Sequence, residues 1–185
     1  MKLHRPFLLL ALVTILLASG AASYAQTGGT FCVTIEGIKQ GKLKSEMTRT
    51  VCGDRIPGVR FSYQVNSPRD VATGMASGKR QHNPVVISTE WGPATPQIFQ
   101  ALTTNEVLKS VLIEFVRTGP TGIAEVYQTI RLTNATVSSV RMHVNDPQPG
   151  GAVDNRPLAE VAFTFQRIEM ENRPGKTMAV DEWTR

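Results

Sequence analysis

Residues 107–132 read VLKSVLIEFVRTGPTGIAEVYQTIRL, and this stretch decides the fold class of the chain. Two segments rich in β-branched and aromatic residues, 107–117 and 126–132, flank the turn sequence GPTG at residues 119–122. Glycine supplies the backbone freedom that a tight turn needs, and proline restrains it. The stretch therefore predicts a β-hairpin.

Outside this hairpin, apolar residues alternate with polar ones along most of the chain. Phe31, Val33 and Ile35 share one face of an expected strand, and residues 59–65 repeat the pattern. Alternation with a period of two is typical of strands that are buried on one face. We expect further strands at residues 84–91, 137–144 and 161–170.

The last expected strand changes face part-way along. Phe163 and Phe165 share one parity, whereas Ile168 has the other. A bulge near residues 166–167 would reconcile the two halves. A strand buried on both faces, first by its own core and then by a neighbouring subunit, would also explain the pattern.

A short helix is expected directly after the strand at residues 84–91. Pro93 ends that strand because proline cannot donate to a sheet. Thr95 is a suitable N-cap, Pro96 suits the first helical position, and Asn105 is a plausible end. The apolar stripe of this helix would consist of Ile98, Phe99 and Leu102.

Together these elements predict an all-β fold with one short helix. About seven short strands favour a small β-barrel or sandwich, with the α-helix flanking one side. Residues 145–155 are rich in Pro, Gly and Asp and predict a loop. We expect residues 172–185, which are polar, to form a flexible tail.

The N-terminus has the three parts of a secretory signal. Basic Lys2 and Arg5 precede an apolar run at residues 7–18, and small residues end at Ala25. The alternative is a membrane anchor, but the run is short of the roughly 20 apolar residues that span a bilayer. We therefore expect a signal peptide at residues 1–25 and a single exported domain at 26–185, in the periplasm or outside the cell, with no stable membrane insertion after cleavage.

The charge of the chain argues against nucleic acid as a partner. The whole chain carries a formal charge of +5, and without residues 1–25 it has 18 Lys and Arg against 15 Asp and Glu. Proteins that bind nucleic acid show stronger or more clustered positive charge. This balance is too mild to indicate such a function.

Both cysteines, Cys32 and Cys52, lie in the part of the chain that would be exported. An oxidising compartment would permit a disulfide, which stabilises by about 3 kcal/mol in the chain-entropy model. The alternative is two unpaired thiols in a chain that folds in the cytoplasm, and spacing alone does not exclude a geometry too wide to close. An even number of cysteines beside an export signal favours the bridge.

The sequence does not gather the residues that an enzyme needs. Beyond the leader the histidines are His82 and His143, and neither has cysteine or acidic partners at metal-ligand spacing. Residues 74–79 resemble a phosphate loop superficially, but the spacing is one residue short and a strand follows where a helix should. We therefore expect no catalytic site, no cofactor and no metal.

A long polar connection, residues 67–84, joins two of the expected strands. Compact domains rarely carry so long a loop without a function. Several motifs in and around it resemble the Hcp family, the tube protein of bacterial type VI secretion systems. These motifs are IEGIK at residues 35–39, SPRD at 67–70, TG at 73–74, GKRQH at 78–82, EWG at 90–92, PQ at 96–97, FQAL at 99–102, IRLTNA at 130–135 and EVAFTFQRI at 160–168.

The resemblance implies a small β-barrel with a flanking helix that associates into six-membered rings. In the family, the long loop contacts the next ring in a stack, so residues 67–84 would be the stacking arm. The residues that this assigns to stacking are Ser67, Arg69, Asp70, Lys79, Arg80 and His82.

The function that follows is structural rather than enzymatic. The subunit would form hexameric rings that stack into a tube, carry or chaperone effector proteins, and meet other type VI components. The leader departs from the family pattern, because ordinary tube subunits carry no cleavable signal. The alternative is therefore an exported binding module that does not form tubes, in which the cysteine bridge replaces stability once given by neighbours.

Overall fold

The computed structural model describes residues 30–45, 51–144, 146–147 and 153–183. The signal peptide expected at residues 1–25 lies outside them. Within the described residues, no helix has the length and apolar character needed to cross a membrane.

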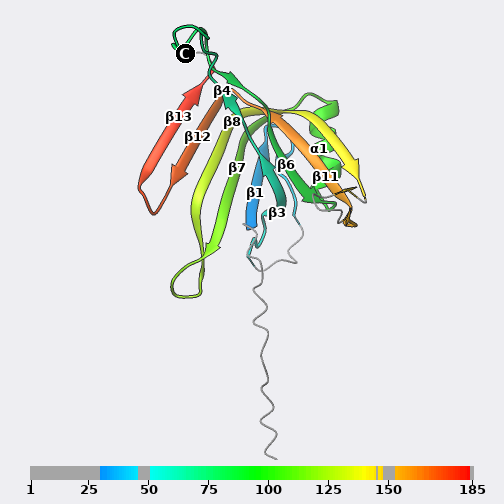
Figure 1. Cartoon of the computed structure of the whole chain (residues 1–185). Helices are drawn as coiled ribbons and strands as arrows, with labels where there is room; N and C mark the ends of the chain where they lie inside the picture. Colours follow the sequence, from blue (N-terminus) through cyan, green and yellow to red (C-terminus); the bar gives the residue numbers. More distant parts are fainter. Residues whose placement is uncertain (1–29, 46–50, 145, 148–152, 184–185) are drawn as a thin grey trace, which may run out of the picture.

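Six strands close into an antiparallel barrel (Figure 1). Around the wall, each strand pairs with the next and the last pairs again with the first. In spatial order the strands are β1 (Thr30–Gly37), β3 (Ile56–Ser62), β6 (Val85–Glu90), β11 (Leu158–Thr164), β8 (Ala124–His143) and β7 (Val107–Thr118). The expected barrel with one flanking helix is confirmed.

Strand β8 is a single long strand where the sequence predicted two. One edge pairs with β7, and the other pairs with β12 (Arg167–Asn172) and then with β11. Asn134 lies between these two halves with φ at 48°, and its side-chain amide donates to Gln166 Oε1 at 3.1 Å. Asparagine tolerates this left-handed conformation, so the chain changes partner without ending the strand.

The change of face near residue 166 is an interruption between β11 and β12. Phe165 and Gln166 separate the two strands, both of which pair with β8. Phe163 and Ile168 are then both buried in the core although their sequence parity differs. The break predicted from the sequence is thus real.

Expectation and structure differ at the C-terminus. Residues 177–182 are not a flexible tail but strand β13 (Thr177–Glu182), antiparallel to β12 over six residue pairs. Within the described residues β13 pairs with no other strand, so it is the outer strand of an extension from the barrel. The backbone hydrogen bonds to β12 hold this segment in place, so it is not a loose tail.

The helix α1 (Ala94–Thr103) begins earlier than predicted. Pro93 occupies the N-cap, and the Thr95 hydroxyl accepts the Gly92 N–H at 3.0 Å instead of capping the helix itself. The buried stripe consists of Ala94, Ile98 and Ala101, whereas Phe99 is half exposed. Because helical residues repeat about every 3.6 positions, a buried face through Ala94, Ile98 and Ala101 turns Phe99 toward solvent.

One continuous apolar cluster connects the barrel strands and the helix. It includes the predicted set Phe31, Val33 and Ile35, all nearly inaccessible to solvent. The ring of Phe31 lies against Gly58 so closely that an added Cβ there would come within 1.9 Å of it. This packing gives the rigid frame from which the loops project.

Within the described residues, five two-residue strands lie outside the barrel wall. The short strand β2 (Gly41–Lys42) follows the turn after Gly37 and pairs with the end of β1. In the segment predicted as a loop, β9 (Asp146–Pro147) pairs with β10 (Val153–Asp154). The other two, β4 (Val65–Asn66) and β5 (Gln81–His82), pair at the base of the long loop.

Candidate functional site

The long loop is a folded hairpin that projects from the barrel. We call residues 67–84 the arm. The β4–β5 pair forms its base, and a bridge between Arg69 and Ala76 continues the pairing outward. In Figure 1 the arm rises above the barrel, and the end of strand β13 lies near its base.

The tip of the arm is a turn held by one carboxylate. Asp70 Oδ1 accepts the N–H of Ala72 at 3.1 Å, the N–H of Thr73 at 2.8 Å and the Thr73 hydroxyl at 2.8 Å. The hydrogen bonds from Thr73 and Ala72 lower the pKa of the Asp70 carboxyl. Gly74 completes the turn with φ at +68°, a value that favours glycine.

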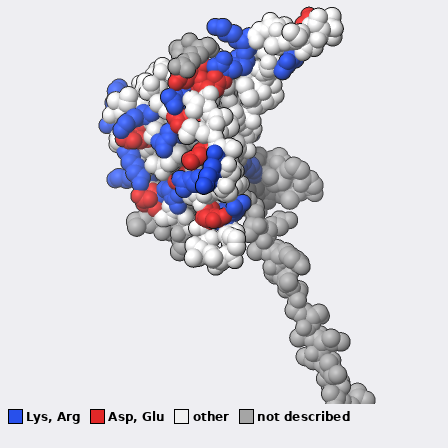
Figure 2. Space-filling view, turned by 90° about the vertical axis from the view of Figure 1, so that its left-hand side faces the viewer, with Lys and Arg blue, Asp and Glu red and all other residues white. Residues whose placement is uncertain are grey.

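The surface of the tip is apolar and exposed. Val71 is fully exposed at 102% and Met75 is 69% exposed. Figure 2 shows the projecting part of the molecule mostly free of charge, whereas the face over β12 and β13 carries mixed Lys, Arg, Asp and Glu. Two exposed apolar side chains on a preformed turn are suited to contact with another protein surface.

The base of the arm is anchored to the last strand. The Arg80 guanidinium binds both carboxylate oxygens of Asp181 and donates to the Glu182 carbonyl at 2.6 Å. The hydrogen bonds from Arg80, with those from His82, outweigh partial burial and lower the pKa of the Asp181 carboxyl. Bidentate binding fixes the direction of the guanidinium as well as its position.

The imidazole of His82 lies inside this anchor. Its Nε2 is 3.0 Å from Asp181 Oδ2 and its Nδ1 is 2.5 Å from the Tyr63 hydroxyl. The rings of Tyr63, Phe165 and Trp183 surround it at centroid distances of 6.2, 5.5 and 5.6 Å. The side chain of His82 is only 5% exposed. We call the set Tyr63, Arg80, His82, Phe165, Asp181 and Trp183 the anchor cluster.

A hydroxyl, an imidazole and a carboxylate in series also form the relay of hydrolytic enzymes. Here burial, reinforced by the charge of Asp181, raises the pKa of the Tyr63 hydroxyl, which opposes its use as a nucleophile. Arg80 neutralises the carboxylate that would support the imidazole, and His82 is closed off by aromatic rings. The cluster is therefore built to hold the arm.

The six residues that the sequence assigned to stacking fall into two groups. Ser67, Arg69, Asp70 and Lys79 lie exposed along the arm, whereas Arg80 and His82 turn inward to Asp181. Their partner is about one hundred positions away in the sequence. Sequence reasoning missed Asp181 because no local pattern links the arm to a polar C-terminal segment.

The two cysteines form a disulfide in the structure. Cys32 on β1 and Cys52 are joined with their Cα atoms 5.5 Å apart, and both are buried. Val116 and Val126 pack against them. The segment around Cys52 is also held by Arg55, which donates to Glu114 at 2.8 Å and to the Cys52 carbonyl at 2.9 Å.

A second buried carboxylate holds the turn after β1. Glu106 is 2% exposed and accepts the N–H of Lys39 at 2.7 Å, the N–H of Gln40 at 2.9 Å and the Gln40 amide at 2.9 Å. Burial alone would raise the pKa of Glu106, but these hydrogen bonds outweigh it and the pKa is lowered. A Cβ on Gly37 would lie 2.4 Å from Glu106 Oε1, so any other residue here would push the carboxylate out of these hydrogen bonds.

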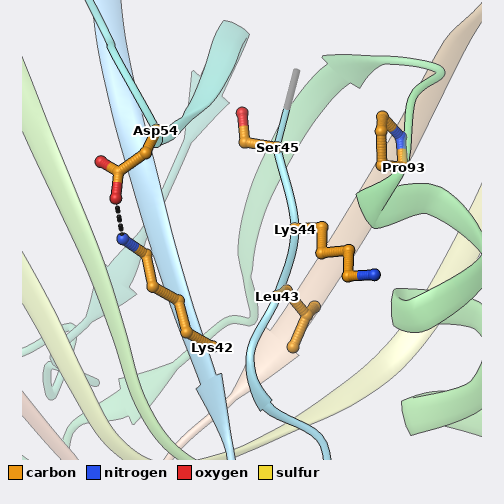
Figure 3. Close-up of a pocket in the computed structure, with 6 residues that line it drawn as sticks. All are labelled: Lys42, Leu43, Lys44, Ser45, Asp54 and Pro93. Atoms are coloured by element: carbon orange, nitrogen blue, oxygen red, sulfur yellow. Dashed lines mark hydrogen bonds and ion pairs between the residues drawn. The ribbon is translucent and has the colours of Figure 1, made fainter. Parts of the chain in front are cut away.

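A shallow pocket of about 340 Å³ lies beside the start of the helix, and Figure 3 shows the residues that line it. Its charged pair, Lys42 and Asp54, is satisfied by an ion pair, and the other lining residues are Leu43, Lys44, Ser45 and Pro93. In the parts of the chain that the structure describes, no three His, Cys, Asp or Glu side chains are grouped to hold a metal ion. The arm and its anchor cluster are therefore the candidate site.

Comparison with known sequences identifies the family. The family model described as "Type VI secretion system effector, Hcp" matches residues 33–171, about three quarters of the chain. The "Major exported protein" of Pseudomonas aeruginosa is 30% identical over 160 residues, which covers 82% of this chain and 93% of that protein.

Solved structures share the fold over the same region. A structure described as "Crystal structure of Hcp protein" has a TM-score of 0.75 at 24% identity, and covers 84% of this chain and 98% of its own. The secreted protein Hcp3 of Pseudomonas aeruginosa has a TM-score of 0.69 at 24% identity, with the same two coverages. The chain belongs to the Hcp family of type VI secretion proteins.

Proposed function

We propose that this protein is an exported, tube-type subunit that assembles with itself into hexameric rings, and that the arm stacks one ring on the next. The observation that carries the proposal is the arm, a folded hairpin with an exposed apolar tip and an anchored base. A loop that served only to connect β3 and β6 would not need either feature.

Stacking is supported by the physical character of the tip. Its turn is already formed by Asp70 and Gly74, so little conformational entropy is lost when it docks. Burial of Val71 and Met75 would supply the apolar contact, and Arg69 and Lys79 would add polar contacts at the rim. Each ring would present six arms, so six weak contacts made together would bind one ring strongly to the next.

Ring closure is supported by the outer strand of the extension. Strand β13 carries Met178 and Val180 on its exposed face, at 65% and 45% exposure. An outer strand with unpaired backbone groups and apolar side chains invites pairing with another subunit. A closed ring would cover this edge in every copy.

Export and cargo are also part of the proposal. A leader cleaved at residue 25 would send the chain to the periplasm or outside the cell, where the disulfide between Cys32 and Cys52 is chemically stable. The lumen of the ring would carry or chaperone effector proteins. Ring closure needs only complementary subunit surfaces, so rings can form after export.

The test compares assembly of the purified, processed protein with that of tip variants. Light scattering and negative-stain images should show hexameric rings and stacked tubes. Val71→Asp combined with Met75→Asp should leave rings but shorten the tubes. Ile123→Asp is the control, since Ile123 is an apolar residue on a different hairpin and at 71% is about as exposed as Met75. Equal tube lengths for the tip variant and the unaltered protein would reject the stacking role.

The second candidate is an exported binding module that does not assemble. The observation that favours it is the inward turn of Arg80 and His82, which removes two polar groups from the expected stacking surface. A protein that stays monomeric at high concentration would support this function. Alkylation of the unreduced, denatured protein tests the bridge separately, since two modified cysteines would show that the exported form lacks it.

A further inference from the structure

We infer that Arg80, His82 and Asp181 form a clamp through which the C-terminal strand β13 sets the direction of the arm. Arg80 and His82 act as positioning residues instead of contacts to the next ring. The consequence for stacking rests on the function proposed above, whereas the clamp itself is a property of one subunit.

The clamp joins the base of the arm to strand β13. Arg80 and His82 belong to the base of the arm, and Asp181 belongs to β13. Within the described part of the chain, the β4–β5 pair is a sheet of its own and does not join the barrel sheet. The arm is therefore held on the barrel by its short connections to β3 and β6, where the Asn83 N–H donates to the Gln64 carbonyl, and by side-chain contacts, among which the clamp supplies charged ones.

Several independent hydrogen bonds restrain the base of the arm. Arg80 makes a bidentate bond to Asp181 and a third bond to the Glu182 carbonyl, which fixes the guanidinium plane. His82 is held from both ring nitrogens, by Asp181 and by Tyr63. Restraints from several directions leave the base of the arm one orientation.

Strand β13 is itself held by contacts to the rest of the sheet. Its register is fixed by β12, and Trp183 just after it donates its backbone N–H to the Gln166 carbonyl at 3.0 Å. Gln166 lies at the junction of β11 and β12, next to Phe165 of the anchor cluster. The clamp therefore connects the arm to the part of the barrel wall where β8 changes partner.

The experiment measures amide hydrogen exchange in the purified protein. Asp181→Asn and Arg80→Gln should each speed exchange about tenfold at the arm base, where the Asn83 N–H donates to the Gln64 carbonyl, because a charge-assisted pair is lost. Glu125→Gln is the matched control, since it breaks the exposed Arg117–Glu125 pair elsewhere and should leave the arm unchanged. Exchange at the core amide of Leu43 reports whether each variant is folded.

A double-mutant cycle separates a clamp from general loosening. If Arg80 and Asp181 act together, the double variant should exchange no faster than the Asp181→Asn variant. Effects that multiply, or unchanged exchange at Asn83 in both folded single variants, would overturn the clamp.

Tube length then tests what the clamp does. Clamp variants that form rings should give shorter tubes than the Glu125→Gln control. Tubes of unaltered length with a loosened arm would overturn the positioning role. If even the unaltered protein forms no tubes, the proposed stacking function fails, and the exchange measurements still decide the clamp.

Discussion

Two turns in this molecule are held by the same chemistry in opposite surroundings. At the tip of the arm, the exposed Asp70 carboxylate accepts two backbone N–H groups and the Thr73 hydroxyl. After β1, the buried Glu106 carboxylate accepts two backbone N–H groups and the Gln40 amide. The partners of Asp70 are two and three positions away, whereas those of Glu106 are more than sixty positions away.

This difference indicates which turn the whole fold depends on. Water can replace the hydrogen bonds of Asp70 if they break, because the tip is exposed. The Glu106 carboxylate is buried and its hydrogen bonds to Lys39 and Gln40 are partly buried, so water replaces them less completely when that carboxylate is lost. We therefore expect the Asp70 turn to matter for the local shape of the arm and the Glu106 turn to matter for global stability.

The largest expected effect comes from Glu106→Ala. We expect a loss of about 3 kcal/mol in the free energy of unfolding, because a cavity forms and the N–H groups of Lys39 and Gln40 become unsatisfied. Urea unfolding followed by circular dichroism measures it. Asp70→Ala, the matched variant at the arm tip, should change the same quantity by less than about 0.5 kcal/mol. Equal losses in the two variants would contradict the expected difference between the two turns.

The next effect concerns the glycine of each turn. Gly37→Ala places a methyl group against the Glu106 carboxylate, and we expect a cost of about 2 kcal/mol because the buried site cannot yield easily. Gly74→Ala meets no neighbour but has φ at +68°, so we expect about 1 kcal/mol of local strain at the arm tip.

Thermal and urea unfolding of both glycine variants give the global cost. Only Gly37→Ala should shift the midpoint clearly if the arm tip opens independently of the barrel. A larger shift for Gly74→Ala would show instead that the arm and the barrel unfold as one unit.

Acid should reveal the two carboxylates separately. The pKa of Glu106 is lowered from its ordinary 4.5, so its contribution is complete above that pH and is lost as the pH falls through the lower folded value. The difference in unfolding free energy between the unaltered protein and Glu106→Gln should be constant above about pH 5 and shrink below it. A difference that grows toward low pH would contradict the lowered pKa.

The smallest effect is expected at the arm tip. The pKa of Asp70 is also lowered, from 3.8, so its contribution is likewise lost as the pH falls. Losing the Asp70 carboxylate should alter only the exchange of the Ala72 and Thr73 amides. We expect exchange at these amides to rise a few-fold in Asp70→Ala while the core amides stay unchanged. Hydrogen exchange measured by NMR resolves the two groups.

Much of the barrel was predictable because its signals are local. The alternation of Phe31, Val33 and Ile35 defines a strand face. The residues between β7 and β8 define a turn, whatever the register in which these strands pair. The helix start was placed too late, since Thr95 has the chemistry of an N-cap but uses its hydroxyl for Gly92. Residue type at a helix end limits the possible caps without choosing among neighbouring positions.

The candidate site was only half predictable. The arm and its exposed residues Arg69 and Lys79 follow from the long polar connection and the family motifs. The anchor was not predictable, because Asp181 lies in a segment that reads as a polar tail. Its edge strand has few buried residues, so the usual alternation signal is weak there.

By itself the sequence determined most strands of the barrel wall, the arm and the family, and it favoured the disulfide, because alternation, turn residues and motif order act over short distances. Only the tertiary structure decided that Arg80 and His82 face Asp181, that Glu106 fills the turn at Gly37, and that β8 serves two partners. These contacts join residues far apart in the chain. Their positions depend on barrel closure, which no local pattern contains.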